Sequence, residues 1–161
     1  MQLTPLDAPN LPDPVRASWV RIDSNRKQRD AFELMCPILY PAYESIDRRH
    51  MTADLLTGAH AVLVLTIHDL PVACMALTRK QRIVEYTLVA VLPHMQNQGL
   101  GTHMLRTADS VARMLVDESG PFTAVVTLPV TNRVPHRLLE TAGFVMAAMS
   151  VQLLYIKLIT A

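Results

Sequence analysis

The chain has 161 residues, half of them hydrophobic, and a formal net charge of +1. This length suits one domain with one core, and the nearly balanced charge argues against nucleic acid or an anionic membrane as a partner. No apolar run reaches the roughly 18 residues that suggest a membrane span, and residues 1–14 lack the pattern of a signal peptide. We therefore expect a single cytoplasmic domain over residues 1–161.

The first half of the chain is predicted to alternate strands with helices. Residues 1–14 carry several prolines and should form an irregular arm. A helix is expected over residues 26–35, where Pro37 should end it, and a second helix should follow that includes Tyr43, Ile46 and Met51. The expected strands share runs of aliphatic and β-branched side chains, and they cover residues 15–22, 61–67, 72–78 and 83–92.

The second half is predicted to continue with helix, strand and helix. Apolar residues recur on one face between residues 100 and 115, which indicates a helix, and a strand is expected over residues 122–128. A strand, a helix and a strand in this order favour a parallel pair, whereas the short links between the preceding strands favour an antiparallel meander. A short helix over residues 133–142 should end at Gly143 in a left-handed cap.

The last stretch, residues 144–160, is rich in apolar β-type residues and contains no Gly, Pro, Asn or Asp to form a tight turn. It either turns at Met149-Ser150 or runs on as one long, bent strand. A long apolar strand exposes an unpaired edge, which a second copy of the chain could cover. The sequence therefore predicts a homodimer built on this C-terminal strand.

The loop at residues 96–101 connects the strand over residues 83–92 to the next helix. It reads Gln96-x-x-Gly99-x-Gly101. Backbone N–H groups in the first turn of a helix have no partners within the helix, and the helix dipole makes this end positive. Because glycine has no Cβ, a phosphate could approach the main chain closely here. The pattern therefore predicts an anion site, and an ordinary strand-to-helix turn is the alternative.

The same loop resembles the pyrophosphate loop of GNAT-type N-acetyltransferases, whose motif is Gln/Arg-x-x-Gly-x-Gly/Ala. Upstream, Val91-x-Pro93 occupies the place of that family's Val-x-Pro, and downstream the family's Asn and Gly-Phe are matched by Asn132 and Gly143-Phe144. The resemblance implies an α/β fold with a mixed, mostly antiparallel central sheet and helices on both faces.

The resemblance also implies that acetyl-coenzyme A is the cofactor. The main-chain groups of Val89 and Val91 would pair with its pantetheine arm, where two strands separate at a bulge. The loop and first helical turn would bind the pyrophosphate through backbone N–H groups, and these residues are Gln96, Asn97, Gln98, Gly99, Leu100, Gly101 and Thr102. Asn132 would contact the cofactor arm through its amide, or it serves only as a turn residue.

Glu85 is the candidate general base. It is the only carboxylate in the strand over residues 83–92, and histone-type members of the family place a catalytic glutamate six positions before the equivalent of Val91. A charge among apolar strand residues is costly to bury unless it is paired or functional. The alternative is that Glu85 lies beside Arg82 in solvent.

The general acid is where the sequence departs from the family pattern. Many members carry a tyrosine on the last short helix, four residues before the Gly of Gly-Phe, and this chain has Leu139 there. His136 lies one turn earlier, and Tyr86 and Tyr155 are other phenols whose positions the sequence leaves open. Because a thiolate is a good leaving group, an acid is helpful rather than obligatory.

The resemblance implies transfer of acetyl from acetyl-coenzyme A to a primary amine by direct attack. The alternative function is a catalytically weak or inactive acyl-coenzyme A-binding or interaction module of the same fold. The acceptor stays open among a polyamine, an amino acid, an antibiotic and a protein amine. In the family, the helical segment between the first and second strands lines the acceptor site. This suggests a substrate role, or simple helix packing, for Phe32, Tyr40, Tyr43 and Glu44.

The cysteines and histidines show no pattern of a metal site. Cys36 and Cys74 are far apart in the sequence, and the histidines lack His-x-x-x-His spacing. We expect two free thiols and no metal.

Overall fold

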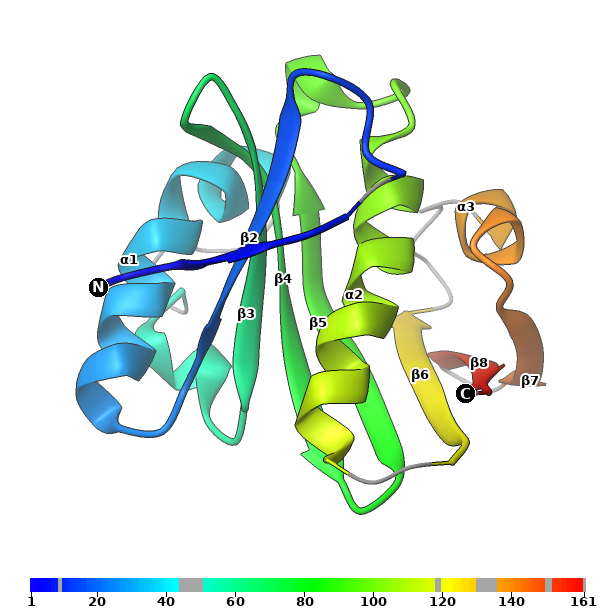
Figure 1. Ribbon diagram of the computed structural model, residues 1–161. Helices are drawn as coiled ribbons and strands as arrows, with labels where there is room; N and C mark the ends of the chain where they lie inside the picture. Colours follow the sequence, from blue (N-terminus) through cyan, green and yellow to red (C-terminus); the bar gives the residue numbers. More distant parts are fainter. Residues whose placement is uncertain (9, 44–50, 118–119, 130–135, 150–151, 161) are drawn as a thin grey trace.

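The computed structural model describes the whole chain except residues 9, 44–50, 118–119, 130–135, 150–151 and 161. Within the described residues, eight strands form one sheet in the order β1-β2-β3-β4-β5-β6-β8-β7 (Figure 1). The strands are β1 (Thr4–Leu6), β2 (Val15–Arg21), β3 (Ala61–Ile67), β4 (Leu70–Lys80), β5 (Ile83–Val91), β6 (Phe122–Pro129), β7 (Val145–Met149) and β8 (Gln152–Ile159). The helices are α1 (Asn25–Ala42), α2 (Leu100–Val116) and α3 (His136–Thr141), with 3-10 turns η2 (Ala53–Leu56) and η3 (Pro93–Met95).

The sheet is mixed and mostly antiparallel. Among the described strands only β5 and β6 pair in parallel, across the α2 crossover, and β3, β4 and β5 form an antiparallel meander. At the turn between β3 and β4, His68 and Asp69 have φ values of 50° and 64°, as a tight hairpin turn requires. The predicted fold class is therefore confirmed.

Helices α1 and α2 cover opposite faces of the sheet (Figure 1). Their apolar sides bury two separate clusters, one that contains Met35 and Ile38 of α1 and one that contains Met104 and Val111 of α2. Helix α3 lies on the α2 side, because Leu139 packs in the α2 cluster. Burial of large aliphatic side chains on both faces supplies most of the stabilisation of such a layered domain.

The divergence of β5 from β6 positions the site. The two strands pair only from residue 83 to Glu85, which lies opposite Val125, although both continue beyond that row. Leu88 has a left-handed φ of 51°, and the register between β4 and β5 shifts at the same place. A β-bulge of this kind bends its strand and re-aims the main chain. The sheet therefore opens between β5 and β6 beyond the bulge.

The N-terminal arm is more regular than its prolines predict. Residues Thr4–Leu6 form β1, which pairs antiparallel with Ala17–Trp19 of β2. Pro5 cannot donate to a ladder, but an edge strand leaves half of its main-chain groups without a ladder partner. Leu6 also packs against the α2 cluster. The expectation of an irregular arm is therefore wrong for these residues.

Helix α1 does not end at Pro37 as predicted, but continues through Pro37 and Pro41 to Ala42. Each proline removes one backbone hydrogen bond, and the spacing of four places both on the same side of the helix. The opposite side is fixed by side chains that are fully buried, such as Met35 and Leu39. Packing therefore outweighs the local preference to stop. Ile46 of the expected second helix lies outside the described residues.

The C-terminal stretch forms a hairpin rather than one long strand. Strand β8 pairs with β6 on one side and with β7 on the other, so it lies inside the sheet. The connection falls at residues 150–151, outside the described residues. The unpaired edge of this half of the sheet therefore belongs to β7, where Val145 and Met146 are exposed.

Candidate active site

The N-terminus of α2 presents free backbone donors. Gly99 is its N-cap, with a left-handed φ of 80°, and the first helical hydrogen bond runs from the His103 N–H to the Gly99 carbonyl at 3.0 Å. The N–H groups of Leu100, Gly101 and Thr102 therefore have no partner in the helix. Because the first turn holds no acidic residue, the positive end of the dipole is uncompensated there.

A cavity of about 730 Å³ connects this helix end to the opening in the sheet. Its lining residues come from α1, β5, the loop before α2, α2 itself and α3; they are Ala42, Tyr43, Val89, Ala90, Val91, Met95, Gln96, Asn97, Gly99, Leu100, Gly101, Thr102, Arg137, Leu138 and Thr141. Arg137 is the one charged side chain in this set. The cavity therefore connects a helix end that is suited to bind phosphate with the main chain of β5.

The main chain of Val89 and Val91 faces the opening. The Leu92 N–H donates to the Val72 carbonyl of β4 at 2.9 Å, and main-chain groups of successive residues point to opposite sides. The main-chain N–H and carbonyl groups of Val91 therefore point away from β4, and those of Val89 do the same. The Tyr43 hydroxyl donates to the Val89 carbonyl at 2.9 Å, and the Gln96 amide donates to the Val91 carbonyl at 3.1 Å. Each carbonyl keeps a second lone pair, and each N–H stays available to a ligand.

Tyr43 connects the end of α1 to the bulged strand. It is the C-cap residue of α1, its N–H donates to the Leu39 carbonyl at 2.9 Å, and its side chain lines the cavity. Burial raises the pKa of Tyr43 to about 12, with a smaller contribution from Cys74. At neutral pH the phenol is therefore a neutral hydrogen-bond donor.

The structure brings together most of the residues predicted to bind the cofactor. Those that line the cavity are Val89, Val91, Gln96, Asn97, Gly99, Leu100, Gly101 and Thr102. Gln98 is not among them, because its side-chain amide turns back to the His94 carbonyl at 3.4 Å. Asn132 lies outside the described residues.

Glu85 lies outside the cavity lining. It is half-buried on β5 in the last row that pairs with β6, and its neighbours Val84 and Tyr86 are buried under α2. Side chains alternate along a strand, so Glu85 points to the opposite face of the sheet. It makes no hydrogen bond or ion pair with the residues that the structure describes.

The α3 side of the cavity was not predicted. Arg137, Leu138 and Thr141 line it, and a Cβ added at Gly101 would lie 3.2 Å from Leu138 Cδ2. Gly101 therefore permits α3 to approach α2, a contact between distant segments that no local motif encodes. Leu139, at the position of the family's tyrosine, is buried in the α2 cluster.

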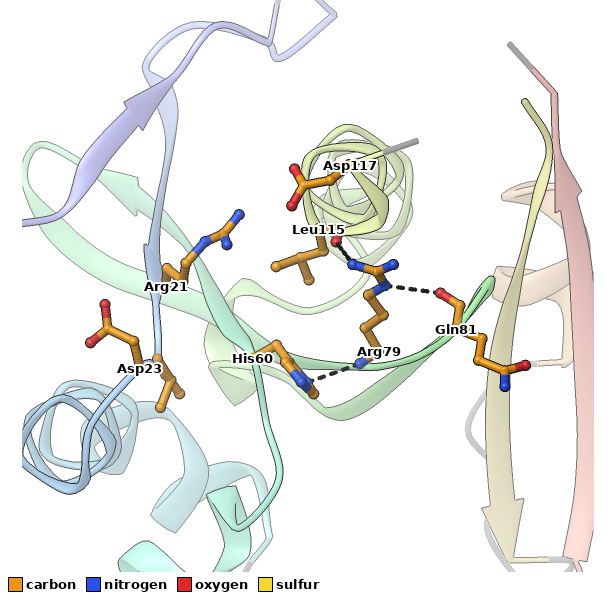
Figure 2. Close-up of a pocket in the computed structure, with 8 residues that line it drawn as sticks. Arg21, Asp23, His60, Arg79, Gln81, Leu115 and Asp117 are labelled. Atoms are coloured by element: carbon orange, nitrogen blue, oxygen red, sulfur yellow. Dashed lines mark hydrogen bonds between the residues drawn. The ribbon is translucent and has the colours of Figure 1, made fainter. Parts of the chain in front are cut away.

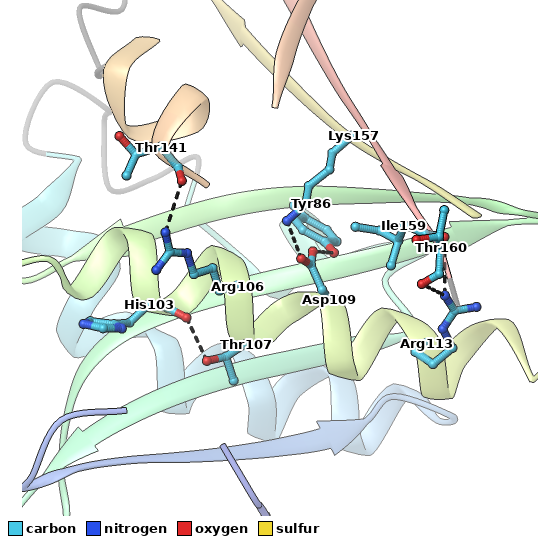
Figure 3. Close-up of polar contacts among 10 residues, drawn as sticks. All are labelled: Tyr86, His103, Arg106, Thr107, Asp109, Arg113, Thr141, Lys157, Ile159 and Thr160. Carbon is cyan, nitrogen blue, oxygen red and sulfur yellow. Dashed lines mark hydrogen bonds and ion pairs between the residues drawn. The ribbon is translucent and has the colours of Figure 1, made fainter. Parts of the chain in front are cut away.

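Polar contacts hold α2 in place behind the cavity (Figure 3). Asp109 accepts hydrogen bonds from the Tyr86 hydroxyl at 2.7 Å and from Lys157 Nζ at 2.5 Å. Burial and the adjacent Asp109 carboxylate raise the pKa of Tyr86 well above its ordinary value, so this phenol stays neutral. Arg106 donates to the Thr141 carbonyl at 3.3 Å and ties α2 to α3.

A second depression, of about 410 Å³, lies at the C-terminal end of α2 (Figure 2). Arg79 donates there to the Leu115 carbonyl at 2.7 Å and to the Gln81 carbonyl at 2.9 Å, and its N–H donates to His60 Nδ1 at 3.1 Å. A guanidinium at the last carbonyls of a helix stabilises the helix end. This arrangement accounts for Arg79 structurally.

None of the described helices has the length and apolar character needed to cross a membrane. Cys36 and Cys74 are free, and burial raises the pKa of the Cys74 thiol. A thiol of raised pKa is a poor nucleophile near neutral pH.

Comparisons with known proteins agree with the fold. Residues 28–144 match the acetyltransferase (GNAT) family. Ard1 from Thermoplasma volcanium superposes with a TM-score of 0.66 at 14% identity, covering 90% of this chain and 99% of that chain. The PaiA N-acetyltransferase from Thermoplasma acidophilum, solved with coenzyme A, gives 0.62 at 12% identity, covering 88% and 98%.

The ribosomal-protein-S18-alanine N-acetyltransferase from Escherichia coli gives a TM-score of 0.62 at 14% identity, covering 89% of this chain and 93% of that chain. No curated protein matches the chain. At these identities the structural likeness concerns the fold alone. The family match, however, extends from α1 through the loop and α2 to Phe144, which is most of the chain. The chain therefore belongs to the GNAT family of acetyltransferases.

Proposed function

We propose that this chain transfers acetyl from acetyl-coenzyme A to a primary amine by direct attack. The observation that supports this most is the cavity that joins free N–H groups of α2 to the main chain of β5 at the opening of the sheet. The free N–H groups of α2 suit the phosphates of coenzyme A, and the main chain of β5 suits the amide groups of its pantetheine arm.

The residues present fit this donor. Among the described lining residues none carries a carboxylate, and Arg137 adds positive charge. A side chain at Gly99 would force its left-handed φ of 80° on a residue with a Cβ, and a side chain at Gly101 would meet Leu138. Val89, Val91 and the N–H groups from Leu100 to Thr102 would therefore hold the donor through the main chain.

The reaction needs a neutral amine and a polarised thioester carbonyl. The amine nitrogen attacks the carbonyl carbon, a C–N bond forms, the C–S bond breaks, and the electron pair leaves with sulfur as thiolate. A free N–H of β5 at Val89 or Val91 would stabilise the negative charge on the carbonyl oxygen. The protons lost by the ammonium pass to a base and to the departing thiolate or solvent.

Glu85 is the base in this proposal, acting through water. It precedes the bulge at Leu88 by three residues, roughly 10 Å along an extended strand, which is too far for direct contact with an amine at the bulge. A hydrogen-bonded water chain spans such a gap. The carboxylate has no partner among the described residues, so it is free to accept a proton.

Thiol release with saturating acetyl-coenzyme A and a panel of primary amines tests the proposal. Glu85→Gln should lower kcat/KM by about a hundredfold, because a positioned general base contributes roughly that much. The wild-type rate should rise with pH through one apparent pKa, since the base must be ionised, and the variant should lose that rise. Calorimetric titration should show unchanged coenzyme A affinity. A wild-type-like pH profile would leave Glu85 a structural residue.

The alternative is a binding module that no longer catalyses transfer, and Leu139 is the observation that favours it. A buried leucine replaces the proton donor of many family members. The two functions differ in turnover. Tight coenzyme A binding without thiol release from any amine would identify the module, whereas release that Glu85→Gln abolishes would identify the enzyme.

A further inference from the structure

The cavity at the N-terminus of α2 passes through the opening of the sheet. Helices α1 and α2 cover opposite faces (Figure 1), and both contribute to the lining. On the α2 face the lining includes residues 100–102 of the first helical turn, and on the α1 face it includes Ala42 and Tyr43. The cavity therefore reaches from the N-terminus of α2 to the C-terminal end of α1.

Tyr43 bounds the α1 end of the cavity with a ring that is fixed at two points. Its backbone N–H donates to the Leu39 carbonyl at 2.9 Å, and its hydroxyl donates to the Val89 carbonyl at 2.9 Å. Between these two contacts the side chain packs against the apolar cluster between α1 and the sheet. Close packing and two hydrogen bonds together hold the ring in one position. The ring is therefore a fixed wall of the cavity.

Small side chains flank this wall. Ala42 and Ala90, which neighbour Tyr43 and Val89 in the chain, also line the cavity. Tyr43 is the one aromatic residue among the described residues of the lining. The phenol ring, rather than the side chains beside it, therefore limits the space at this end of the cavity.

The contacts along β5 give the direction in which the donor would lie. The loop before α2 meets β5 at Val91, because the Gln96 amide donates to the Val91 carbonyl at 3.1 Å, whereas Tyr43 meets β5 at Val89. Val89 and Val91 are two residues apart, roughly 7 Å along an extended strand. With its phosphates at the N-terminus of α2, coenzyme A would reach Val91 first and Val89 next. The acyl group, at the far end of the arm, would then lie beside Tyr43.

We propose that Tyr43 determines which acyl group the donor carries: its ring leaves room for acetyl and excludes longer acyl chains. The inference rests on the proposed function and adds the donor specificity to it. A longer chain would have to push the ring away from Val89 and out of its packing against the apolar cluster. Extra methylene groups forced against a well-packed wall weaken binding.

Calorimetric titration of the full chain with acetyl-coenzyme A and with butyryl-coenzyme A, in the absence of any amine, tests this inference. The wild type should bind the butyryl donor at least about tenfold more weakly, because two extra methylene groups meet the ring. In Tyr43→Ala that difference should fall to about threefold or less, since the space left by the ring can receive the chain. Tyr43→Phe keeps the ring and loses only its anchor at Val89, so its difference should lie between the two.

Met95→Ala is the matched control, because Met95 also lines the cavity but comes from η3, before α2. It should keep the wild-type difference between the two donors. Each comparison uses two donors on the same variant, so a loss of stability in Tyr43→Ala changes both affinities by the same factor.

Two results would overturn the inference while the proposed function stands: equal binding of both donors by the wild type, or a difference in Tyr43→Ala as large as that of the wild type. An equal fall of the difference in Met95→Ala would assign the effect to the volume of the cavity as a whole and would overturn the inference as well. Absence of coenzyme A binding would reject both the inference and the proposed function.

Discussion

Tyr43 illustrates how a single side chain links two elements at the site. Its hydroxyl donates to the Val89 carbonyl at 2.9 Å, just after the bulge at Leu88. Tyr43→Phe should lower the free energy of unfolding by about 1 kcal/mol, the net worth of one such hydrogen bond. Chemical denaturation measures this change.

The pH dependence of Tyr43 should differ from that of Glu85. Burial raises the pKa of Tyr43 to about 12, so the fold favours its protonated form; its contribution to stability is complete below pH about 10 and is lost as pH rises toward 12. Between pH 6 and 9 the phenol does not titrate. The pH–rate profile of Tyr43→Phe should therefore keep the apparent pKa of the wild type. If Tyr43→Phe lost the rise in rate with pH, Tyr43 rather than Glu85 would be the titrating group.

Gly99 and Gly101 are predicted to admit the pyrophosphate, and the structure separates their roles. Replacing either with valine should weaken coenzyme A binding more than it lowers stability. At Gly101, however, the added Cβ would lie 3.2 Å from Leu138 Cδ2, so a bulky valine would also strain the packing there. Gly101→Ala is therefore the sharper test, because it adds one methyl group at the cavity. Calorimetric titration should show about tenfold weaker coenzyme A binding, as one misplaced methyl group in a close-fitting site costs. Unchanged affinity would remove Gly101 from the site.

At the scale of elements, Asp109 holds α2 against β5 and β8. Its carboxylate accepts from Tyr86 and Lys157, and the side chains of Asp109 and Lys157 are only 18% and 20% exposed. Asp109→Asn keeps an acceptor for Tyr86 but leaves the ammonium of Lys157 without its counter-charge. We expect a loss of about 2 kcal/mol in the free energy of unfolding, less than for a fully buried pair because some solvent reaches it.

Asp13→Asn is the matched control for that change. The Asp13–Arg16 pair has an N–O distance of 2.8 Å, but its side chains are 88% and 68% exposed. Exposed pairs contribute little, so its removal should change stability by less than about 0.5 kcal/mol. Equal changes in the free energy of unfolding for the two substitutions would show that partial burial does not make the Asp109–Lys157 pair more stabilising than an exposed pair.

At the scale of the whole molecule, we still expect the homodimer, now through β7. Among the described residues, strand β7 pairs only with β8, so its other edge has no strand partner there, and Met146 is 50% exposed. Light scattering at micromolar concentration should show a dimer. Met146→Lys should convert it to a monomer, since a charge on an edge strand opposes pairing, whereas Leu70→Lys should not. A monomeric wild type would refute the prediction.

Deletion of the residues after Gln152 would be a poor test of this prediction. Strand β8 lies between β6 and β7, so its removal would separate β7 from the sheet rather than expose an edge. A point substitution on β7 leaves the other strand pairs intact.

The sequence by itself determined the elements whose signals are local. Composition predicted β3 over residues 61–67, and glycine and helical periodicity predicted the loop and the start of α2 at Leu100. The same loop predicted most of the cavity lining on the α2 side. Turns, caps and amphipathic periods depend on residues a few positions apart, so they can be read along the chain.

Only the tertiary structure decided which distant segments meet. Helix α1 continues through Pro37 because buried side chains on its other side pack against the sheet, and β8 enters the sheet between β6 and β7 because strand order is a property of pairing between segments. The hydrogen bond from Tyr43 to Val89 joins residues 46 positions apart. Such contacts depend on packing and on the entropy of closing long loops, and local sequence signals encode neither.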